Sequence, residues 1–500
     1  MTALPKLFGR DISLPEEPMY LPASVPSEET LSAKDKLCRT IIEYGLLALI
    51  VFTPLPIASV DDWAILLIEL VAAALTAVYF LMGTRPQVNG RLLQRLPWPR
   101  YALLAFFVLF LPFQLIPIPK SILRLFSPHA YSLQQQYSPR FAEMKSISLS
   151  LVPSQTLREG LLLLAYALIG FLVVRVITRR VQIRRMMIAI VGVGTFEAFF
   201  GLFMLYQKNP SLLFYSKTHN LDSATGTFVN RNHFSGYLEL VIPIALTLFI
   251  SRIDLFTFPS KKWRQRLAVL TGKGTSINIL LAVGIVMMSL GILLSNSRAG
   301  GVLLLVIFML FFEMIVFYFS RSRFRKMWIK NFLKIMFVVI TLIALYVGIE
   351  SMVGRFSLDN LLQDGRPRYW TTVMRIVKDF PLFGTGLGTF GLTYEAYETL
   401  GLSGMLAHAH NDYLEYMSEL GLLGFVLLAA PILFVLVDSF LTWTKRRNPE
   451  IKSLALGGII SVFVMLVHSF TDFNLHIPAN ALLFVVILAM NWSAIYYRKS

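Results

Sequence analysis

The chain has 500 residues, of which 56% are hydrophobic and only 15% are charged. So few charges cannot cover a water-exposed surface, which excludes a soluble globular fold and indicates a membrane protein. The net charge of +17 does not require a nucleic-acid partner, because membrane proteins gather Lys and Arg on their cytoplasmic side. The single Cys38 excludes an intrachain disulfide framework.

Apolar segments long enough to cross a bilayer recur along nearly the whole chain. A helix of about 17–25 apolar residues crosses the hydrocarbon core, and the chain is predicted to be all-α with about twelve such spans. They are 40–57, 63–82, 101–118, 159–177, 186–206, 235–251, 277–295, 300–320, 332–350, 415–442, 453–470 and 480–497. Before them, the polar and proline-rich segment 1–39 is expected to be a disordered cytoplasmic tail without a cleavable signal peptide.

The basic residues between the spans predict the orientation of the chain. They gather on one side, around Arg85, Arg91, Arg95 and Arg100, Arg179, Arg180, Arg184 and Arg185, Lys261, Lys262, Arg264 and Arg266, Arg321, Arg323, Arg325 and Lys326, Lys445, Arg446 and Arg447, and Arg498 and Lys499. That side is therefore cytoplasmic, and both termini are expected there. The chain then divides into nine spans over 40–350 with outer loops 119–158 and 207–234, a large periplasmic loop over 351–414, and three spans over 415–500.

Two short motifs on the outer side contain unusual polar residues. Asn230-Arg-Asn-His233 precedes a span that contains Glu239, for which a structural partner and a substrate hydroxyl are equally good explanations. Arg298 is the only basic residue in the short outer connections, against the charge bias of the rest of the chain. It could anchor a helix end by snorkelling, but the guanidinium fork also matches phosphate oxygens, and we favour that function.

The large outer segment contains a predicted amphipathic helix over 366–380. Trp370, Val373, Met374 and Val377 fall on one stripe of this helix, which Pro381 would end. An interfacial helix with its Arg residues on lipid phosphates is the simpler alternative for this segment. The glycines that follow, over 384–388, predict a flexible turn that could bring the backbone close to a ligand.

The segment His408-Ala-His-Asn-Asp-Tyr-Leu-Glu415 is the most informative part of the sequence. Two histidines, an amide and two carboxylates are costly to place at the edge of a bilayer, which favours a functional site over packing. Histidine suits proton transfer near neutral pH. We also considered metal binding by His408, His410 and Asp412, but no Cys or HExxH motif supports it, so no metal is expected.

The motifs as a set resemble the O-antigen ligase and polymerase superfamily. The matching segments are Asn230-Arg-Asn-His233, Ser297-Arg-Ala-Gly-Gly301, Arg366 to Trp370, Asp379 to Gly386, His408 to Gly424 and His468 to Asn474, within about 150–500. The resemblance implies about twelve spans, a fold like that of the C-type glycosyltransferases, and a large periplasmic loop between the ninth and tenth helices. It also implies a bacterial inner-membrane enzyme that moves a glycan from undecaprenyl diphosphate without nucleotide sugars, cofactor or metal.

Roles for individual residues follow from this resemblance and from the chemistry. Arg298 and Arg366 would stabilise the leaving diphosphate, with Arg231 or Arg368 in support. His410 would accept the proton of the acceptor hydroxyl. Side chains expected to orient the base or a sugar hydroxyl are those of Asn411, Asp412, His408, Glu415 and Asn232. His408 lies close to His410 in the sequence, and neighbours on a helix do not share a face, so the two histidines are not expected to have the same role.

The sequence leaves several functions open. The acceptor could be a growing glycan, a lipid A core, or a Ser or Thr of a protein, which would make the chain a polymerase, a ligase or a protein glycosylase. Membrane lipids surround the protein, and a chain-length regulator is a further candidate partner. A lipid-linked oligosaccharide flippase is the alternative from another class, since many spans and intramembrane Glu residues also suit transporters. The polar residues gather at one face, which favours the enzyme.

Overall fold

The structure is a computed structural model that describes residues 31–83, 98–207, 211–212, 215–217, 219–251, 273–318, 366–398, 406–445 and 449–496. The described part is helical apart from two short antiparallel strand pairs. β1 (Ile118–Pro119) pairs with β2 (Ser146–Ile147), and β3 (Ser211–Leu212) pairs with β4 (Tyr215–Ser216).

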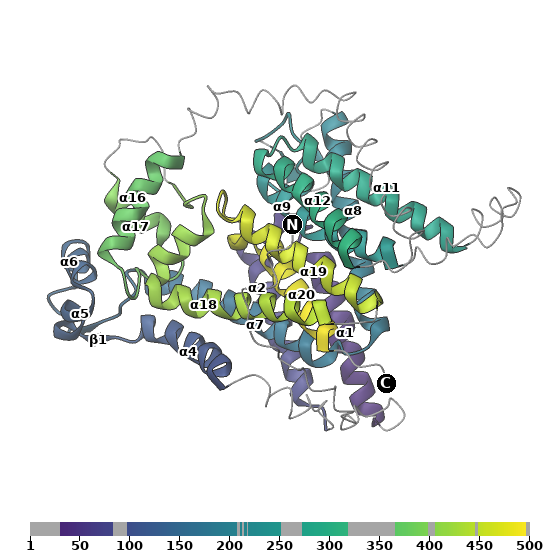
Figure 1. The fold of residues 1–500 in the computed structure, drawn as a ribbon. Coiled ribbons are helices and arrows are strands. Elements are labelled where there is room, and N and C mark those ends of the chain that lie inside the picture. The colour runs from purple at the N-terminus through teal and green to yellow at the C-terminus, as the bar shows by residue number, and fades with distance from the viewer. Residues whose placement is uncertain are drawn as a thin grey trace, which may run out of the picture.

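Long apolar helices account for most of the described chain (Figure 1). They are α1 (Ala33–Phe52), α2 (Asp62–Phe80), α4 (Trp98–Leu115), α7 (Pro153–Val176), α8 (Arg180–Gln207), α9 (Arg231–Ser251), α11 (Lys273–Leu294), α12 (Arg298–Tyr318), α18 (Asp412–Lys445), α19 (Pro449–His468) and α20 (Pro478–Tyr496). Each coincides with a predicted span, and the remaining predicted span, 332–350, lies outside the described residues. In the described part, 6 helices are long and apolar enough to cross a membrane. The chain is therefore an all-α membrane protein.

The first helix begins earlier than the sequence predicted. Ser32 caps it by accepting a hydrogen bond from Asp35 N at 3.1 Å, so α1 starts inside the segment that we expected to be a tail. It ends at Phe52, because the prolines at 54 and 56 cannot continue a helix. The predicted span of 40–57 was therefore displaced toward the C-terminus. Residues 1–30 lie outside the described part.

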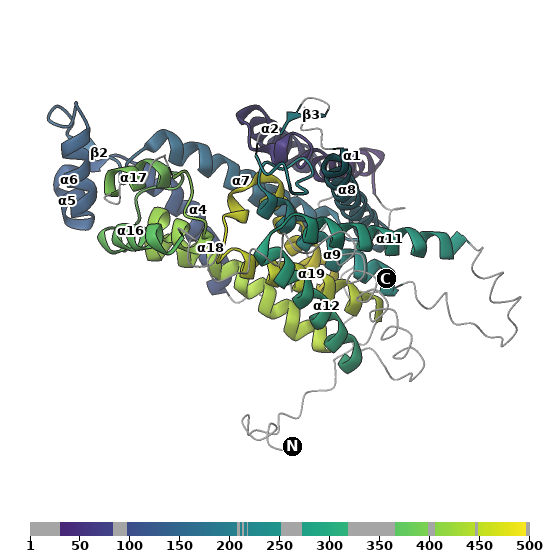
Figure 2. The same cartoon turned by 90° about the horizontal axis from the view of Figure 1, so that it is seen from above.

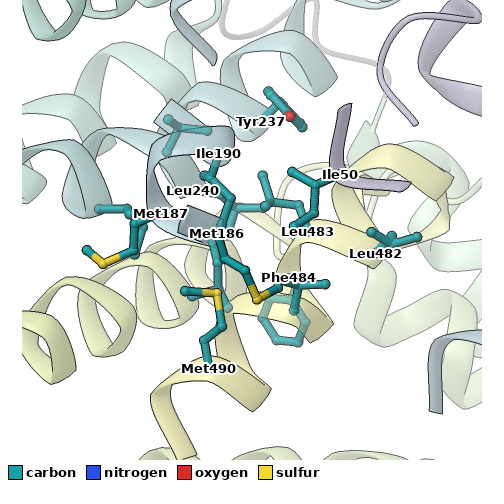
Figure 3. Close-up of a cluster of buried hydrophobic side chains, with 14 of the residues drawn as sticks. Ile50, Met186, Met187, Ile190, Tyr237, Leu240, Leu482, Leu483, Phe484 and Met490 are labelled. Atoms are coloured by element: carbon teal, nitrogen blue, oxygen red, sulfur yellow. The ribbon is translucent and has the colours of Figure 1, made fainter. Parts of the chain in front are cut away.

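Helix α9 forms the centre of the bundle. Every residue from His233 to Ile250 is buried, because α8, α11, α12 and α19 pack around it. A helix that is apolar on all sides needs such an enclosed position. Figure 3 shows part of this core, where Met186 of α8, Leu240 of α9 and Phe484 of α20 interdigitate.

A smaller lobe stands beside the bundle (Figures 1 and 2). It contains α5 (Lys120–Phe126), α6 (Pro128–Tyr137), α16 (Arg366–Asp379) and α17 (Phe390–Tyr397), with the β1–β2 pair. Its own core includes Leu123, Val373 and Phe380. The amphipathic helix was predicted correctly, but part of its buried stripe was wrong. Met374 is 41% exposed, whereas Thr372 and Ile376 are buried against the rest of the lobe.

Helix α18 connects the lobe to the bundle and is interrupted near its start. Gly421 has φ 64° and ψ −179°, a conformation that only glycine adopts readily. The glycine-rich turn over 384–388 packs directly on this interruption, where Gly386 N donates to Glu419 O at 2.9 Å. A Cβ on Gly384 would lie 2.2 Å from the Glu419 carbonyl. We predicted that this turn brings backbone close to a ligand; in the described part it lies against the backbone of α18.

Candidate active site

The ends of several helices meet at one end of the bundle. α9 begins there at Arg231, α12 at Arg298 and α18 at Asp412, and α19 ends there at His468. The connection 469–477 between α19 and α20 lies among them, and Asp412 N donates to one of its carbonyls at 2.9 Å. Residues from distant parts of the sequence therefore come within hydrogen-bonding distance of one another.

Asp472 is the centre of a first network. Its side chain is only 1% exposed, and Oδ2 accepts a hydrogen bond from Asn232 Nδ2 at 2.5 Å. Oδ1 lies 3.0 Å from His410 Nδ1 and 3.5 Å from His233 Nε2, and Arg366 Nη2 lies 3.6 Å from Oδ2. Burial alone would raise the pKa of this carboxyl, but the hydrogen bond from His410 and the nearby His233 ring hold it well below its usual value. Asp472 is therefore a carboxylate at neutral pH.

His410 has the geometry of a general base. The Asp472 carboxylate can only accept a hydrogen bond, so Nδ1 of His410 must be protonated in this pair. In the neutral imidazole, Nε2 then has the lone pair, and the His410 side chain is 28% exposed. Its backbone has φ 48°, which is unusual for a residue with a side chain. Trp370 Nε1 donates a hydrogen bond to the carbonyl of the neighbouring Ala409 at 2.9 Å. This hydrogen bond links the segment to α16.

A second network lies next to the first and contains two carboxylates. His408 Nδ1 lies 2.7 Å from Glu415 Oε1, and His476 Nδ1 lies 2.7 Å from Asp412 Oδ1. His476 Nε2 also lies 3.5 Å from Glu415 Oε1, which joins the two pairs. Burial alone would lower the pKa of His476, but the charge of Glu415 and the hydrogen bond and charge of Asp412 raise it to about 10. His476 is therefore a partly buried imidazolium at neutral pH.

Phe473 separates the two networks. The His408 ring stacks on it with centroids 4.0 Å apart and planes 13° apart. The rings of His233 and His410 meet it edge-on, at 4.4 Å and 4.9 Å. Three imidazoles are thus fixed in orientation by one phenyl ring.

The predicted diphosphate-binding arginines come together from three helices, and Arg366 contacts the first network. Arg231, Arg298 and Arg366 are the first residues of α9, α12 and α16. Arg231 lies close enough to Arg298 and Arg366 to be repelled by both. A helix N-terminus adds partial positive charge from its free N–H groups, so this arrangement favours an anion. Arg368 is exposed on α16, and no contact of its side chain with these arginines is found in the described part.

Other predicted residues have different partners from those expected. We expected Asn411 or Asp412 to orient the base or a sugar hydroxyl; in the structure neither contacts His410, and Asn411 Oδ1 caps α18 by accepting a backbone N–H at 3.1 Å. Asp412 bonds to His476, and Asp472 takes the expected place beside His410. His408 and His410 also precede the helix, so helical spacing does not separate their roles. Glu239 has a structural partner in His468, at 3.0 Å.

One group in the described part has the composition of a metal site. Ligand atoms of His408, Glu415 and His476 lie within 4.8 Å of one another. Within this group, His408 Nδ1 and Glu415 Oε1 already hydrogen-bond to each other. The metal grouping considered from the sequence, which combined His408, His410 and Asp412, is not found, because each of the three contacts a different partner.

Asp472, Phe473 and His476 had no predicted role. All three lie in the connection 469–477, and Asp472 and Phe473 belong to the segment His468 to Asn474 that resembles the superfamily. That resemblance was the available signal. The hydrophobic context identifies such residues as unusual, but only the fold shows which of them contacts His410.

Two comparisons with known proteins bear on this site. Residues 283–429 match the family described as O-antigen ligase, a range that includes Arg298, Arg366, His408 and His410. The exopolysaccharide production protein ExoQ of Rhizobium meliloti (strain 1021) is 30% identical over 149 residues, which are 26% of this chain and 31% of that protein. The matched part is thus less than a third of that relative's length. Together, the two matches confirm that the chain resembles the O-antigen ligase and polymerase superfamily.

Proposed function

We propose that the protein is a membrane glycosyltransferase that moves a glycan from an undecaprenyl-diphosphate carrier to a hydroxyl of a glycan or lipid A core. The observation that supports this best is the His410–Asp472 pair beside Arg231, Arg298 and Arg366. A base with a fixed tautomer lies next to a group of cations at helix N-termini. Acyl or phosphoryl chemistry would also use such groups, but the resemblance to O-antigen ligases favours glycan transfer.

The proposed reaction needs a base and an anion site. His410 Nε2 takes the proton of the acceptor hydroxyl as its oxygen forms a bond to the anomeric carbon. The bond from that carbon to the diphosphate oxygen breaks, and its electron pair leaves with the diphosphate. Arg298 and Arg366, with Arg231, stabilise the charge that develops there, while Asp472 stabilises the imidazolium. Attack in line with the leaving group inverts the anomeric carbon, which comparison of donor and product linkages would test.

The orientation follows from the same proposal. The basic connections favour cytoplasmic termini and a site at the periplasmic end of a bacterial inner-membrane protein. The lobe with α5, α6, α16 and α17 then lies in the periplasm. A cysteine introduced at exposed Tyr137, in a Cys38→Ser background, should react with a membrane-impermeant maleimide in whole spheroplasts. Reaction only after lysis would reverse this orientation.

The decisive experiment gives the purified protein an undecaprenyl-diphosphate-linked repeat unit and separates the products on a gel. A ladder would identify a polymerase, and transfer only after a lipid A core is added would identify a ligase. Either product should disappear in His410→Ala and persist in His129→Ala, a matched control on α6 with a half-exposed side chain. A chain-length regulator added to the reaction should change the product length of a polymerase.

Inactivity with both acceptors would point to a different acceptor or to a different function. Transfer to a Ser- or Thr-containing protein would leave the enzyme class intact and change the acceptor. In cells, donor that accumulates on the outer leaflet of the His410→Ala strain indicates a blocked transferase. Donor trapped on the inner leaflet would contradict the transferase and favour the flippase.

A further inference from the structure

Helix α5 of the lobe has an apolar face that points away from the core of the lobe. Ile122, Leu125 and Phe126 have the i, i+3, i+4 spacing of one helical face. They are 41%, 78% and 52% exposed, whereas Leu123, on another side of the helix, is buried in the core of the lobe. The helix therefore packs on the lobe through Leu123 and leaves three large apolar residues at the surface.

This face is continuous with the surfaces of two long apolar helices. Phe126 meets Phe383 edge-on with ring centroids 6.0 Å apart, and the ring of Phe113 in α4 lies 5.6 Å from the same ring. Leu423 N, just after the interruption of α18, donates to the carbonyl of Leu382 at 3.2 Å. Phe113, Leu382 and Leu423 are themselves exposed. One apolar surface thus extends from α5 across the 382–383 segment to α4 and α18.

The membrane already covers part of this surface. Only 22% of the apolar window of α18 is buried inside the protein, so most of this membrane helix faces lipid. α4 lies beside α18, and α5 follows the end of α4 at Leu115 after four residues (Figure 1). Contiguous exposed apolar patches mark interaction sites. Because this patch joins a lipid-facing surface, lipid is the occupant that the structure favours.

We propose that α5 lies in the headgroup region of the bilayer, with Ile122, Leu125 and Phe126 inserted toward the acyl chains. Such a helix needs an apolar face beside polar or basic residues. Arg124 is exposed on an adjoining side of α5, where a basic residue suits lipid phosphates. The contact would hold the lobe, and with it α16 and Arg366, at a fixed height above the membrane.

This proposal does not depend on the glycosyltransferase activity or on the orientation of the chain. A bilayer offers the same apolar layer and the same phosphates on either side, so α5 could be tethered by either leaflet. Failure of the transfer assay would therefore leave the tether untouched. Failure of the tether would equally leave the roles of His410 and the arginines untouched.

The test measures the depth of α5 in proteoliposomes that contain the full chain. Leu125→Cys, in the Cys38→Ser background, is labelled with a nitroxide. Its collisions with oxygen, which concentrates among acyl chains, are compared with those of a water-soluble nickel chelate. We expect a label at 125 to lie about 5–10 Å inside the headgroup boundary, the depth of an interfacial helix. Ile122→Cys is a second labelling site on the same exposed face.

Gln135→Cys is the matched control, because it is exposed on α6 of the same lobe among polar residues such as Ser132 and Gln136. A label there should collide with the nickel chelate as freely as a label in water. Equal access of the chelate to labels at 125 and 135 would overturn the proposal. A label at 125 that is shielded from both oxygen and the chelate would also overturn it, and would indicate a protein partner on this face.

A second measurement removes the apolar face. In Leu125→Gln with Phe126→Gln, a label at Ile122→Cys should move out of the bilayer and become accessible to the chelate, because the two remaining sources of apolar contact are lost. Both substituted residues are at the surface, so the lobe should stay folded. An unchanged depth of this label would show that the face does not hold α5 in the membrane.

Discussion

The two histidine–carboxylate networks contain the same kinds of side chain but differ in the charge around them. Asp472 is a single carboxylate that faces Arg366 and two histidines, and Arg231 lies near Arg366 and Arg298. The second network has two carboxylates, Asp412 and Glu415, and its described partners include no arginine. The first is thus suited to the negative charge that develops on a diphosphate, and the second is not.

The comparison shows that the role of a His–carboxylate pair depends on the charges around it. His410 contacts a carboxylate that is shared with cations, and its second nitrogen can take a proton. His476 lies between two carboxylates and is held as a cation, so it cannot be a base at neutral pH. It instead anchors the start of α18. His408 is hydrogen-bonded to Glu415 and stacked on Phe473. This arrangement suits His408 to accept a hydrogen bond from a sugar hydroxyl.

The largest effect should come from the first network. His410→Ala should lower the rate of transfer by about 10²–10⁴, the usual range for a general base. Asp472→Asn should cost a similar amount, because an amide cannot fix the same tautomer. Since both act on one proton transfer, the double variant should be little worse than either single variant. Single-turnover rates of the three variants test this, and fully additive losses would show that the residues act independently.

The second-largest effect on the rate should come from removal of the arginines. Arg298→Ala and Arg366→Ala should each lower the rate by about 10²–10³, the range for removal of a group that stabilises developing charge. Arg368→Ala, two residues along α16 and exposed, is the matched control and should change the rate less than fivefold. Rates at saturating donor measure the effect on the chemical step. An Arg368 effect equal to that of Arg366 would place the anion site differently along α16.

Both networks depend on the start of α18, and the importance of the interruption at Gly421 can be tested by mutation. Gly421→Ala should destabilise the protein by about 1–3 kcal/mol or prevent folding, because φ there is 64° and a Cβ would lie 2.4 Å from the Leu382 carbonyl. Gly160→Ala is the matched control, since that helical glycine has nothing within 4 Å of its Cβ position. Thermal midpoints measure both. A Gly421 variant as stable as the Gly160 variant would show that the interruption is not required.

The second network should make stability depend on pH. The pKa of His476 is raised to about 10 in the folded protein, from about 6.5 when unfolded. Its stabilisation is therefore fully present below pH about 6.5 and is lost as the pH rises through about 10. Thermal midpoints between pH 6 and 10.5 should fall by several degrees, and less steeply in His476→Gln. His129→Gln should behave like the wild type, and parallel curves for wild type and His476→Gln would contradict this assignment.

The smallest effect should come from chelation. Exhaustive treatment with EDTA should leave the transfer rate within about twofold, because the proposed mechanism uses arginines where other transferases use a cation. The rate before and after treatment is compared for wild type and His408→Ala. A loss that is restored by an added divalent cation would assign the group of His408, Glu415 and His476 to a metal ion and would remove the contrast between the networks.

Local patterns in the sequence determined a large part of this protein. Hydropathy identified the apolar helices, because each helix satisfies its own backbone and needs only a run of apolar residues. The 3.6-residue period identified α16, although the exposed Met374 shows that amphipathicity does not settle which edge of a stripe is covered. The polar residues at 231, 298, 366 and 410 stood out because charge is costly next to a bilayer.

The tertiary structure alone decided the pairings. Asn232 and Asp472 are 240 residues apart and share a hydrogen bond, and His410 and Asp472 are 62 apart. No periodicity relates such positions, so the sequence could not show that Asp472, and not Asp412, orients His410. The position of the glycine-rich turn on α18 depends equally on packing between distant segments. Sequence therefore determined which residues are unusual for a membrane, and the packing of helix ends decided which of them act together.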